Sequence, residues 1–371
     1  MQRVLGIVNL HHSISLSALT RRRSLASVGF LARYCFIDFV LSNFANSNIN
    51  EIGVLIKEYP RSLFRHLGLA DKEWSLNAKT GGISLLYNEQ YANHGYYNHD
   101  INNLIENYWF LRSSKADYVV IAPAHILLRM DYRDMIREHI ESKADVTILA
   151  QEVNALEQKD VDCDCLRVDP NQRVLSIEEN HFNEGTSLVS LETVVMKRET
   201  LINLIRTTTQ ISTFFSLRDG LNALCKDWMI RAYTRKGYVR FIDSIQQYVR
   251  CSLELIDPER ASELFSANWP IYTRTYDTPP ARYEETADVK ESYVANGTII
   301  RGTVHHSIIG RDVLIEEGAV VKNCILQSHT RIAKGAHLEY VVVDKEAIIS
   351  EVKEIIGKEN QPVIIKQEEV I

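Results

Sequence analysis

Glycine is missing from the turn that follows the first apolar run of the chain. Residues 4–8 are typical of a buried strand, and residues 9–15 after them read NLHHSIS, without a glycine. Phosphate-binding α/β domains usually place glycines in this turn, because its exposed backbone N–H groups hold the phosphate. Either this domain does not bind phosphate in that way, or its phosphate site has been lost.

The sequence also lacks a long apolar run and an excess of positive charge. No stretch of about 18 apolar residues is present for a membrane span, and the first residues do not resemble a secretion signal. The 42 Lys and Arg residues against 48 Asp and Glu residues give a formal net charge of -6, which argues against an extended nucleic-acid surface. We therefore expect a cytoplasmic protein with no membrane or nucleic-acid partner.

Cysteine pairs with the spacing of metal ligands are absent as well. The six cysteines include no Cys-x-x-Cys pair, and the histidines do not supply the partner spacing of a zinc site. Cys163 and Cys165 flank Asp164 in a polar stretch, and we interpret them as an incidental pair of reduced thiols. No metal site is expected in this chain.

Short apolar runs alternate with longer amphipathic ones through residues 1–255. This alternation of strands and helices is typical of right-handed crossovers and a mostly parallel sheet, as in Rossmann-like α/β domains. We take residues 1–255 as one such domain. Strands are expected at 4–8, 52–56, 118–122 and 146–150, and helices at 37–47, 102–112 and 132–142.

A different period begins near residue 289. Apolar residues recur at a spacing of six, at Ile308, Leu314, Val320, Leu326, Ile332 and Leu338. A hexapeptide period predicts a parallel β-helix, in which each hexapeptide forms one side of a triangular coil; ordinary strands with coincidental spacing are the alternative. Residues 289–371 are therefore expected to form the β-helix with a C-terminal tail. Residues 256–288, with Pro270, Pro279 and Pro280, are expected to form a linker.

Three motifs resemble one protein family. They are FIDFVLSNFANSNINEIGVL at 36–55, RMDYRDMI at 129–136, and NWPIYT followed by TPPAR. They resemble motifs of the bacterial ADP-glucose pyrophosphorylases, also called glucose-1-phosphate adenylyltransferases. The resemblance implies a GT-A-like nucleotidyltransferase domain joined to a left-handed parallel β-helix. It also implies the family's reaction, in which ATP and glucose 1-phosphate give ADP-glucose and pyrophosphate, with Mg²⁺ between the phosphates, for glycogen synthesis.

The chain departs from that family where the phosphates and the metal are handled. Leu25 stands at the position of a phosphate-contacting lysine, and Asn180 at that of the sugar-phosphate lysine. Ala124 and Phe241 replace the two magnesium-binding aspartates. Because preorganised charges supply most of the catalysis of such reactions, we expect no catalytic residues in this chain. It resembles the GlgD-type, non-catalytic subunit of two-component enzymes.

The resemblance then implies a regulatory subunit that modulates a catalytic subunit by hetero-oligomerisation, in the tetramer that the family suggests. This chain alone would need no cofactor, and Mg²⁺ would be used by the catalytic partner. Two alternatives stay open. One is an active or weakly active adenylyltransferase in which Asp243, on the same face of a strand as Phe241, replaces the lost carboxylate. The other is a binding protein that senses a sugar phosphate or a nucleotide.

The resemblance also implies candidates for binding. Arg22, Arg23 and Arg33 are candidates for an effector site, because guanidinium groups suit bidentate contacts with the phosphates of a sugar-phosphate effector. A solvated basic turn is the alternative. Glu179 and Ser190 are expected to be remnants of the sugar-phosphate pocket.

Four histidines and one aspartate are expected to have structural roles or none. Asp131 precedes an expected helix, and we interpret it as the N-terminal residue of that helix rather than a metal ligand. His11 and His12 are expected to be solvated loop residues that fill a vacated site; binding of phosphate or a metal is the alternative. His329 and His337 are expected on the surface of the β-helix, although they raise the alternative of a hexapeptide acyltransferase.

Overall fold

The computed structural model describes most of the chain and divides it into two compact units. The described residues are 2–12, 14–68, 82–90, 94–154, 163–179, 186–350 and 354–371. The first unit comprises Met1–Ser13, Phe39–Phe241 and Trp269–Ile271, and the second comprises Ile14–Asp38, Ile242–Asn268 and Tyr272–Ile371. This division into compact units does not test the predicted domain ranges 1–255, 256–288 and 289–371, which stay predictions.

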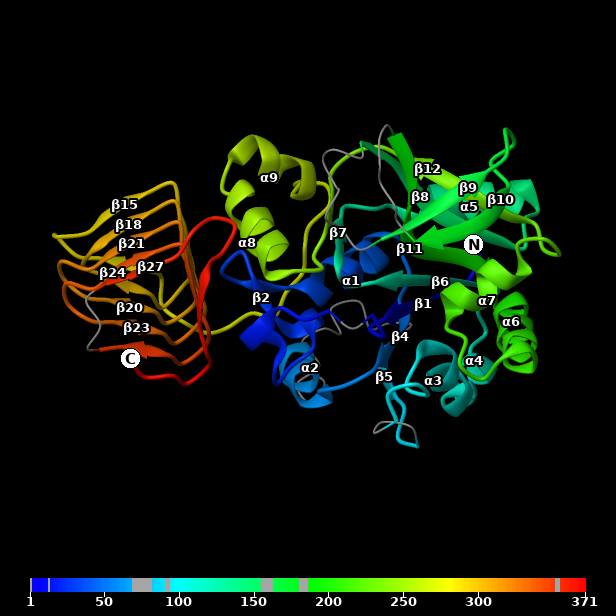
Figure 1. The fold of residues 1–371 in the computed structure, drawn as a ribbon, viewed down its shortest axis with the longest axis horizontal. Coiled ribbons are helices and arrows are strands. Elements are labelled where there is room, and N and C mark those ends of the chain that lie inside the picture. The colour runs from blue at the N-terminus through cyan, green and yellow to red at the C-terminus, as the bar shows by residue number, and fades with distance from the viewer. Residues whose placement is uncertain are drawn as a thin grey trace. The chain divides into compact units, whose positions relative to one another are not determined.

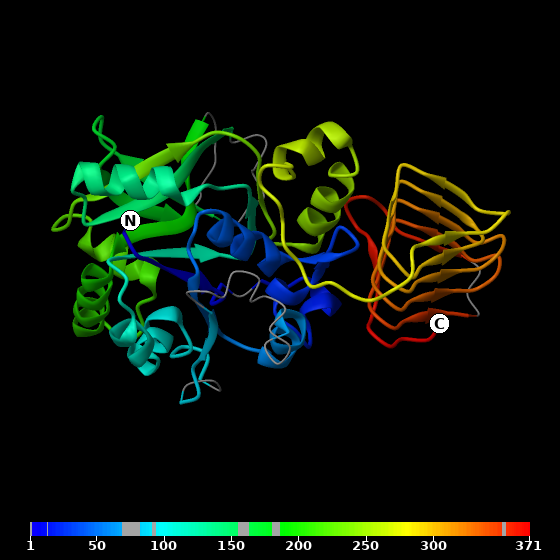
Figure 2. The same cartoon turned by 180° about the vertical axis from the view of Figure 1, so that it is seen from behind.

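Within the described residues, a nine-stranded sheet forms the centre of the first unit (Figures 1 and 2). Its strands run in the order β10-β9-β11-β6-β1-β4-β5, with β8 paired to β11 and β12 paired to β8. The strands are β1 (Val4–Asn9), β4 (Glu51–Ile56), β5 (Ile83–Tyr87), β6 (Tyr118–Pro123), β8 (Val146–Asn154), β9 (Asp164–Val168), β10 (Val174–Glu179), β11 (Thr186–Lys197) and β12 (Ile230–Arg235). Parallel pairs surround β1, whereas β11 is antiparallel to β6 and β8. The expected α/β class is confirmed, in a sheet that is mixed as a whole.

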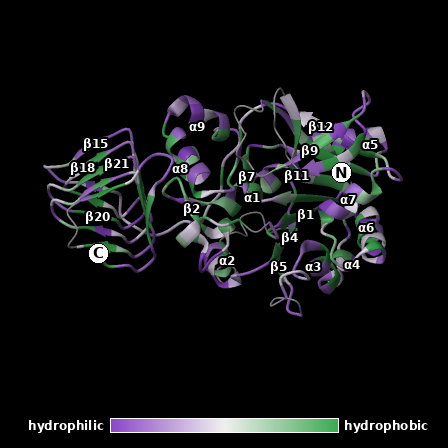
Figure 3. Ribbon diagram, viewed as in Figure 1, coloured by the Kyte–Doolittle hydropathy of each residue, from purple (hydrophilic) through white to green (hydrophobic). Residues whose placement is uncertain are grey.

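Helices of the first unit pack against apolar central strands. Every residue of β6 is buried, and Figure 3 shows hydrophobic residues gathered in β1 and β6. The α-helices of the described residues are α1 (Phe36–Asn46), α2 (Pro60–Leu67), α3 (Asp100–Glu106), α4 (Tyr108–Ser113), α5 (Tyr132–Ser142), α6 (Arg198–Ile211), α7 (Leu217–Leu224), α8 (Ile245–Glu254) and α9 (Pro258–Leu264). In the described part of the chain, none of them has both the length and the apolar character needed to cross a membrane.

Side-chain hydrogen bonds set two helix boundaries. The carboxylate of Asp131 accepts a hydrogen bond from the backbone N–H of Arg133 at 3.0 Å, so α5 begins where the sequence predicts and Asp131 is its cap. The expected helix at 102–112 is instead two helices, α3 and α4, separated at Asn107. The Asn107 side chain donates to the backbone and side-chain oxygens of Asn103, at 3.1 and 3.0 Å. Asparagine side chains compete in this way with the backbone hydrogen bonds of a helix.

The second unit contains three parallel sheets of five strands each in its described residues, as in a left-handed β-helix (Figure 1). The first sheet consists of β14 (Arg282–Tyr283), β17 (Ile299–Ile300), β20 (Leu314–Ile315), β23 (Arg331–Ile332) and β26 (Ile348–Ile349). The second consists of β15 (Asp288–Lys290), β18 (Thr303–His305), β21 (Val320–Lys322), β24 (His337–Glu339) and β27 (Glu354–Ile356). The third consists of β16 (Tyr293–Val294), β19 (Ile308–Ile309), β22 (Ile325–Leu326), β25 (Val341–Val343) and β28 (Val363–Ile365). The expected β-helix is confirmed.

In the central coils of the β-helix the repeat differs from the predicted period by one residue. Thr303 pairs with Val320, and Val320 pairs with His337, which is 17 residues per coil rather than 18. One side of each such coil is therefore five residues long. The buried apolar residues follow at intervals of five or six, at Val304, Ile309, Ile315, Val321, Leu326, Ile332, Leu338, Val343 and Ile349. Consequently Leu314 and Val320, expected inside from a strict spacing of six, are only half-buried.

A buried polar network joins α8 to the β-helix within the second unit. The hydroxyl of Tyr248 donates to the backbone oxygen of Gly29 at 2.9 Å, and Nε2 of Gln327 donates to that hydroxyl at 2.8 Å. Burial raises the pKa of Tyr248, so its hydroxyl keeps its proton. A Cβ at Gly29 would collide with the side chain of Gln327. The network explains why residues distant in sequence form one unit.

Asn43, in the motif at 36–55, has a structural role. It is buried, and its Nδ2 donates to the backbone oxygen of Leu128 at 2.9 Å. Its Oδ1 accepts from the backbone N–H of Met130 at 3.1 Å and from Nε1 of Trp269 at 2.9 Å. One side chain thus fixes the segment after β6 and the first part of the proline-bearing segment.

Replacement of Asn43 by alanine should lower the free energy of unfolding of the first unit by about 2 kcal/mol, because buried partners lose their hydrogen bonds. Urea unfolding followed by tryptophan fluorescence measures the change. Asn46→Ala is the matched control, since Asn46 lies in the same helix and makes an exposed bond to Pro270. Equal losses in the two variants would contradict the structural role of Asn43.

Candidate functional site

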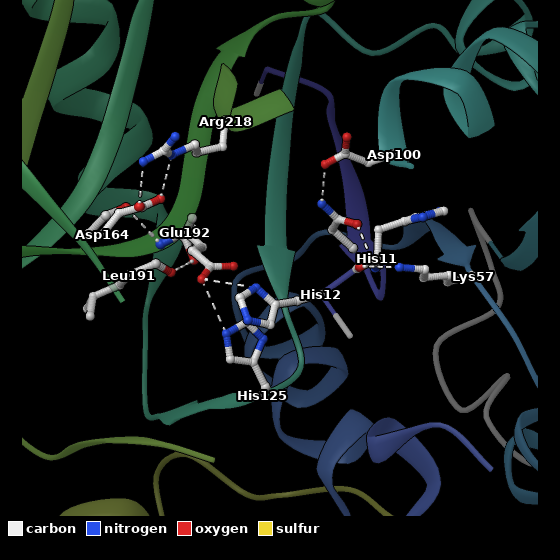
Figure 4. A network of polar contacts seen from close by, with 12 residues as sticks. His11, His12, Lys57, Asp100, His125, Asp164, Leu191, Glu192 and Arg218 are labelled. Carbon is white, nitrogen blue, oxygen red and sulfur yellow. Dashed lines mark hydrogen bonds and ion pairs between the residues drawn. The ribbon is translucent and has the colours of Figure 1, made fainter. Parts of the chain in front are cut away.

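Two histidines lie at the carboxyl ends of neighbouring parallel strands. His12 follows β1, and His125 lies between β6 and β7 (Ile126–Leu128). Because β1 and β6 are parallel neighbours, both histidines reach the edge of the sheet at which open α/β folds bind their ligands. Their rings stack with 4.4 Å between centroids and 28° between planes (Figure 4).

Glu192 reaches the same place from an irregular stretch of β11. The pairing of β11 with β8 shifts register between Ser190 and Val194, and Glu192 there has a left-handed backbone with φ 50°. Its backbone N–H donates to Oγ of Ser190 at 3.1 Å. A bulge re-aims a side chain, and the left-handed conformation costs a non-glycine residue about 1 kcal/mol or more. The regular pairing of β11 is therefore interrupted at the residue whose carboxylate faces the histidines.

The three side chains form a close cluster. Oε1 of Glu192 lies 3.3 Å from Nε2 of His125 and 3.6 Å from Nδ1 of His12. His125 is buried, whereas the side chains of His12 and Glu192 are 33% and 25% exposed. Burial by itself would raise the pKa of the Glu192 carboxyl, but the imidazoles of His125 and His12 lower it to about 2. The cluster therefore presents an ionised carboxylate between two imidazole rings.

A cavity of about 350 Å³ opens beside this cluster in the first unit. Its volume is in the range of small-molecule sites, which are usually clefts of about 300–1,000 Å³. The polar and charged side chains that line it are those of Asn9, His11, His12, Lys57, Asn98, His99, Asp100, Asp164, Ser190, Glu192, Ser216 and Arg218. The cavity can therefore accept a polar molecule of small size.

The charged side chains of this cavity form ion pairs and hydrogen bonds with other groups of its walls. Two nitrogens of Arg218 lie 2.9 and 3.1 Å from the carboxylate of Asp164. Asp100 accepts hydrogen bonds from Nδ2 of Asn9 at 2.9 Å and from the backbone N–H of Leu217, at the start of α7, at 2.8 Å. These pairs position the walls of the cavity and reduce the charge that a ligand would meet.

His11 is buried, contrary to the expectation of a solvated loop residue. Its Nε2 lies 3.0 Å from Nδ2 of Asn103, and its Nδ1 has no hydrogen-bond partner among the described residues. Burial, partly offset by the charge of Asp100, lowers the pKa of His11 to about 4. A neutral imidazole is thus packed under the turn in which phosphate-binding α/β domains usually have glycine. His12 is partly exposed, as expected.

Buried apolar side chains occupy the positions where the resemblance implies magnesium ligands. Ala124, next to His125, is 5% exposed, and Phe241 in β13 (Val239–Phe241) is 2% exposed. Mg²⁺ takes oxygen ligands, which neither side chain supplies, so the residues at these positions do not fit the ion. Leu25 is buried in the second unit, and Asn180 lies outside the described residues.

Of the two predicted remnants of a sugar-phosphate pocket, one lines the cavity described above. Ser190 lines the cavity, whereas Glu179 is exposed at the end of β10 and is not among the lining residues described. Asp243 is not on the strand where it was expected beside Phe241, because β13 ends at Phe241. It is half-buried and belongs to the second unit. That Asp243 replaces the lost metal ligand stays a prediction.

The candidate effector arginines differ in their surroundings. Arg23 is 6% exposed, its Nε donates to the backbone oxygen of Leu19 at 2.8 Å, and its Nη2 pairs with the buried carboxylate of Asp344. The side chain of Arg22 is 73% exposed and lies 3.8 Å from Glu368. Arg23 therefore holds the second unit together, while Arg22 remains accessible to an anion.

A small cavity of about 80 Å³ lies beside these arginines in the second unit. Arg21, Arg22, Arg23 and Lys366 contribute basic side chains to its lining. Arg33 is absent from the lining residues described, and its guanidinium lies 5.3 Å from the ring centre of Tyr34. An effector role for the three arginines stays a prediction, with Arg22 best placed for it.

His125 and Glu192 are the functional candidates that sequence reasoning did not select. His125 directly follows Ala124, and sequence reasoning considered Ala124 alone because it replaces an implied magnesium-binding aspartate. Glu192 interrupts the otherwise uncharged run Thr186–Met196 of β11, and a charged residue inside a buried strand is a usable signal, because charged side chains are almost never buried unless paired. That Glu192 meets His12 depends on the bulge, which the sequence does not reveal.

The fold and the site define a chain with a nucleotidyl-transferase-type region and a hexapeptide β-helix. A family described as nucleotidyl transferase matches residues 15–180, and a family described as GlmU-like, C-terminal hexapeptide matches residues 279–362. Both matches agree with the architecture described above.

Relatives with similar sequences cover nearly the whole chain. The glycogen biosynthesis protein GlgD of Bacillus subtilis (strain 168) is 29% identical over 366 residues, which are 98% of this chain and 96% of GlgD. The glucose-1-phosphate adenylyltransferase of Fervidobacterium nodosum is 29% identical over 360 residues, 95% of this chain and 85% of that protein. The enzyme of the same name from Bacillus mycoides is 28% identical over 343 residues, 91% and 90% of the two chains. The expected resemblance is confirmed: the chain is similar to GlgD and to glucose-1-phosphate adenylyltransferases over more than nine-tenths of its length.

Proposed function

We propose that this chain is a regulatory, catalytically inactive subunit of glucose-1-phosphate adenylyltransferase. The observation that carries the proposal is the pair of buried apolar side chains, Ala124 and Phe241, at the positions implied to hold magnesium. Removal of one electrostatic group from such a site costs roughly 100- to 1,000-fold in rate. Loss of both carboxylates therefore favours a chain that carries out no measurable chemistry of its own.

The proposed biological setting follows from the relatives. GlgD is called a glycogen biosynthesis protein, and the other relatives are glucose-1-phosphate adenylyltransferases. We place this chain in bacterial glycogen biosynthesis in the cytoplasm, where it assembles with a catalytic subunit of the same fold in a tetramer. That partner uses Mg²⁺, whereas this chain alone needs no cofactor.

Regulation in this proposal acts through assembly and through a basic site. A symmetric assembly lets a change in one chain bias the others. The exposed guanidinium of Arg22, beside the cavity that Lys366 also lines, is the group best placed to contact a sugar-phosphate effector. Arg22→Ala should weaken the response of the mixed enzyme to such an effector while basal activity stays unchanged.

Pyrophosphate release tests the proposal. The reaction contains ATP, Mg²⁺ and glucose 1-phosphate, and the samples are this chain, the catalytic homologue of the same genome, and their mixture. We expect no pyrophosphate above background from this chain alone, and changed turnover or effector response in the mixture. The homologue mixed with heat-denatured chain is the control. Unchanged activity on mixing would sink the proposal.

Turnover by this chain alone would instead favour an active adenylyltransferase. In that case Asp243 is the first residue to replace, because it is the carboxylate nearest in sequence to the lost position at Phe241. Asp243→Asn would then abolish the activity. If this variant retained full turnover, some other group would have taken over the metal.

A sugar-phosphate or nucleotide sensor is the second candidate function. The cavity of about 350 Å³, with Ser190 and Lys57 in its lining, favours it because a polar cavity of this size suits a small molecule. Calorimetric titration of the isolated chain with glucose 1-phosphate, ATP and fructose bisphosphate tests it. Saturable binding without any effect on the catalytic homologue would favour the sensor over the subunit.

A further inference from the structure

We propose that His12, His125 and Glu192 bind one divalent metal ion of the class that prefers imidazole ligands, with Zn²⁺ as its representative. Among the described residues, these three form the one group of histidine, cysteine and acidic side chains able to hold an ion, with ligand atoms all within 4.8 Å of one another. All three belong to the first unit. The inference goes beyond the regulatory role and does not depend on it.

The distances within the cluster match those between ligands of a four-coordinate ion. Zinc lies about 2.0–2.2 Å from nitrogen and oxygen ligands, so neighbouring ligand atoms of a tetrahedral site are roughly 3.3 Å apart. Oε1 of Glu192 lies 3.3 Å from Nε2 of His125 and 3.6 Å from Nδ1 of His12 (Figure 4). Two edges of the tetrahedron are therefore close to their final length before an ion enters.

The surroundings of His125 also point to a ligand. The side chain is only 4% exposed, and its Nε2 is paired with Oε1 of Glu192 at 3.3 Å without making a regular hydrogen bond among the described residues. A buried polar atom without a well-formed hydrogen bond is costly and calls for an explanation such as an ion. A metal ion bound between this nitrogen and the carboxylate would give both groups a ligand bond in place of the long ion pair.

The backbone of Glu192 is a separate indication. Its left-handed φ of 50° and the register shift around it place the carboxylate beside the two imidazoles. Bulges and strained backbone conformations occur often at functional sites, where the strain positions a group. Here the positioned group is the third ligand.

The donor set selects the kind of ion. Two imidazole nitrogens and one carboxylate oxygen suit Zn²⁺ and its first-row neighbours, whereas Mg²⁺ prefers an all-oxygen shell. Three protein ligands are also typical of zinc sites that keep a fourth position open. Because His12 and Glu192 line the large cavity, the fourth position would face it and take water or an oxygen of a small anion.

Metal titration of the full-length chain tests this site. The chain is treated with a chelator, dialysed, and titrated with Zn²⁺ by calorimetry and with Co²⁺ by visible absorption. We expect one Zn²⁺ per chain, the absorption of four-coordinate Co²⁺ with nitrogen and oxygen ligands, and much weaker binding of Mg²⁺. These readouts need neither substrate nor a catalytic partner.

Variants locate the ion. Glu192→Gln and His12→Asn should each weaken Zn²⁺ binding about 100-fold or more, since loss of an outer-shell partner alone typically costs 10- to 100-fold. His305→Asn is the matched control: His305 pairs with Asp288 at 2.8 Å on the β-helix, but the described residues supply this pair with no third ligand. The control variant should bind Zn²⁺ like the unaltered chain.

Two results would overturn the assignment. One is the absence of saturable Zn²⁺ and Co²⁺ binding, which would leave the cluster as an ion pair of a carboxylate with imidazoles. The other is binding that survives both Glu192→Gln and His12→Asn, with the absorption of thiolate-bound Co²⁺, which would place the ion on cysteines such as Cys163. Neither result would change the outcome of the pyrophosphate assay, so the two proposals fail independently.

Discussion

Replacement of Arg23 by methionine should lower the free energy of unfolding of the second unit by about 3–5 kcal/mol, because it leaves a buried charge without its partner. Arg23 and Asp344 have side chains only 7% and 2% exposed. The guanidinium also donates to the backbone oxygen of Leu19, so the pair ties the segment at 14–38 to the β-helix. Urea unfolding followed by circular dichroism measures the loss, and hydrogen exchange of the peptides at 14–38 locates it.

Two further variants separate the ion pair from other effects. Arg22→Met should change stability by less than about 0.5 kcal/mol, since its side chain is 73% exposed and its pair with Glu368 is a surface one. The double variant Arg23→Met with Asp344→Leu should recover most of the stability, because replacing both members of a buried pair by apolar groups is often neutral. A double variant as unstable as Arg23→Met alone would mean that packing, not charge, is what Arg23 contributes.

The same pair bears on regulation. An effector phosphate that bound Arg23 would have to compete with a buried carboxylate, whereas one that bound Arg22 would meet an exposed guanidinium. The sequence presents Arg21-Arg22-Arg23 as one basic turn. In the structure these arginines differ in role, because Arg23 faces the interior of the second unit and Arg22 faces solvent.

Much of the fold could be predicted because it rests on periodicity. The apolar runs of β1, β4 and β6 and the capped helix α5 lie where the sequence places them. Prediction failed where one side chain or one residue decides the geometry. Asn107 divides an otherwise continuous amphipathic helix, and a five-residue side in the β-helix moves Leu314 and Val320 out of the interior.

The candidate site could be predicted only in part. The sequence alone shows that the turn after β1 has no glycine and that Ala124 and Phe241 replace implied carboxylates. The cluster of His12, His125 and Glu192 does not follow from the sequence. It requires two strand ends to be neighbours and a bulge to turn Glu192 toward them, and long-range pairing of this kind leaves no local pattern in the chain.

Acidification from pH 6.5 to 4 should lower the free energy of unfolding of the first unit, with up to about 3 kcal/mol coming from His139 alone. His139 on α5 is 1% exposed, and its Nδ1 lies 2.8 Å from Oγ1 of Thr147 on β8. Burial, and then the charge of Lys197, lower its pKa to about 4, although Asp145 opposes the shift. The folded state therefore keeps this imidazole neutral while the unfolded chain takes up a proton below pH 6.5, so the contribution is complete above pH 6.5 and is lost as the pH falls to 4.

Urea unfolding at a series of pH values measures this dependence, and His139→Gln isolates it. Glutamine can still bond to Thr147 but does not titrate, so the variant should lose about half of the decline. Most of the rest comes from His11, whose pKa burial also lowers to about 4, and a smaller part from Glu192, whose pKa the neighbouring imidazoles lower. His329→Gln is the control, because His329 is 55% exposed on the β-helix, and it should leave the profile unchanged. If His139→Gln retained the full decline, the proton taken up on unfolding would belong to other groups, and His139 would have to be charged in the folded chain.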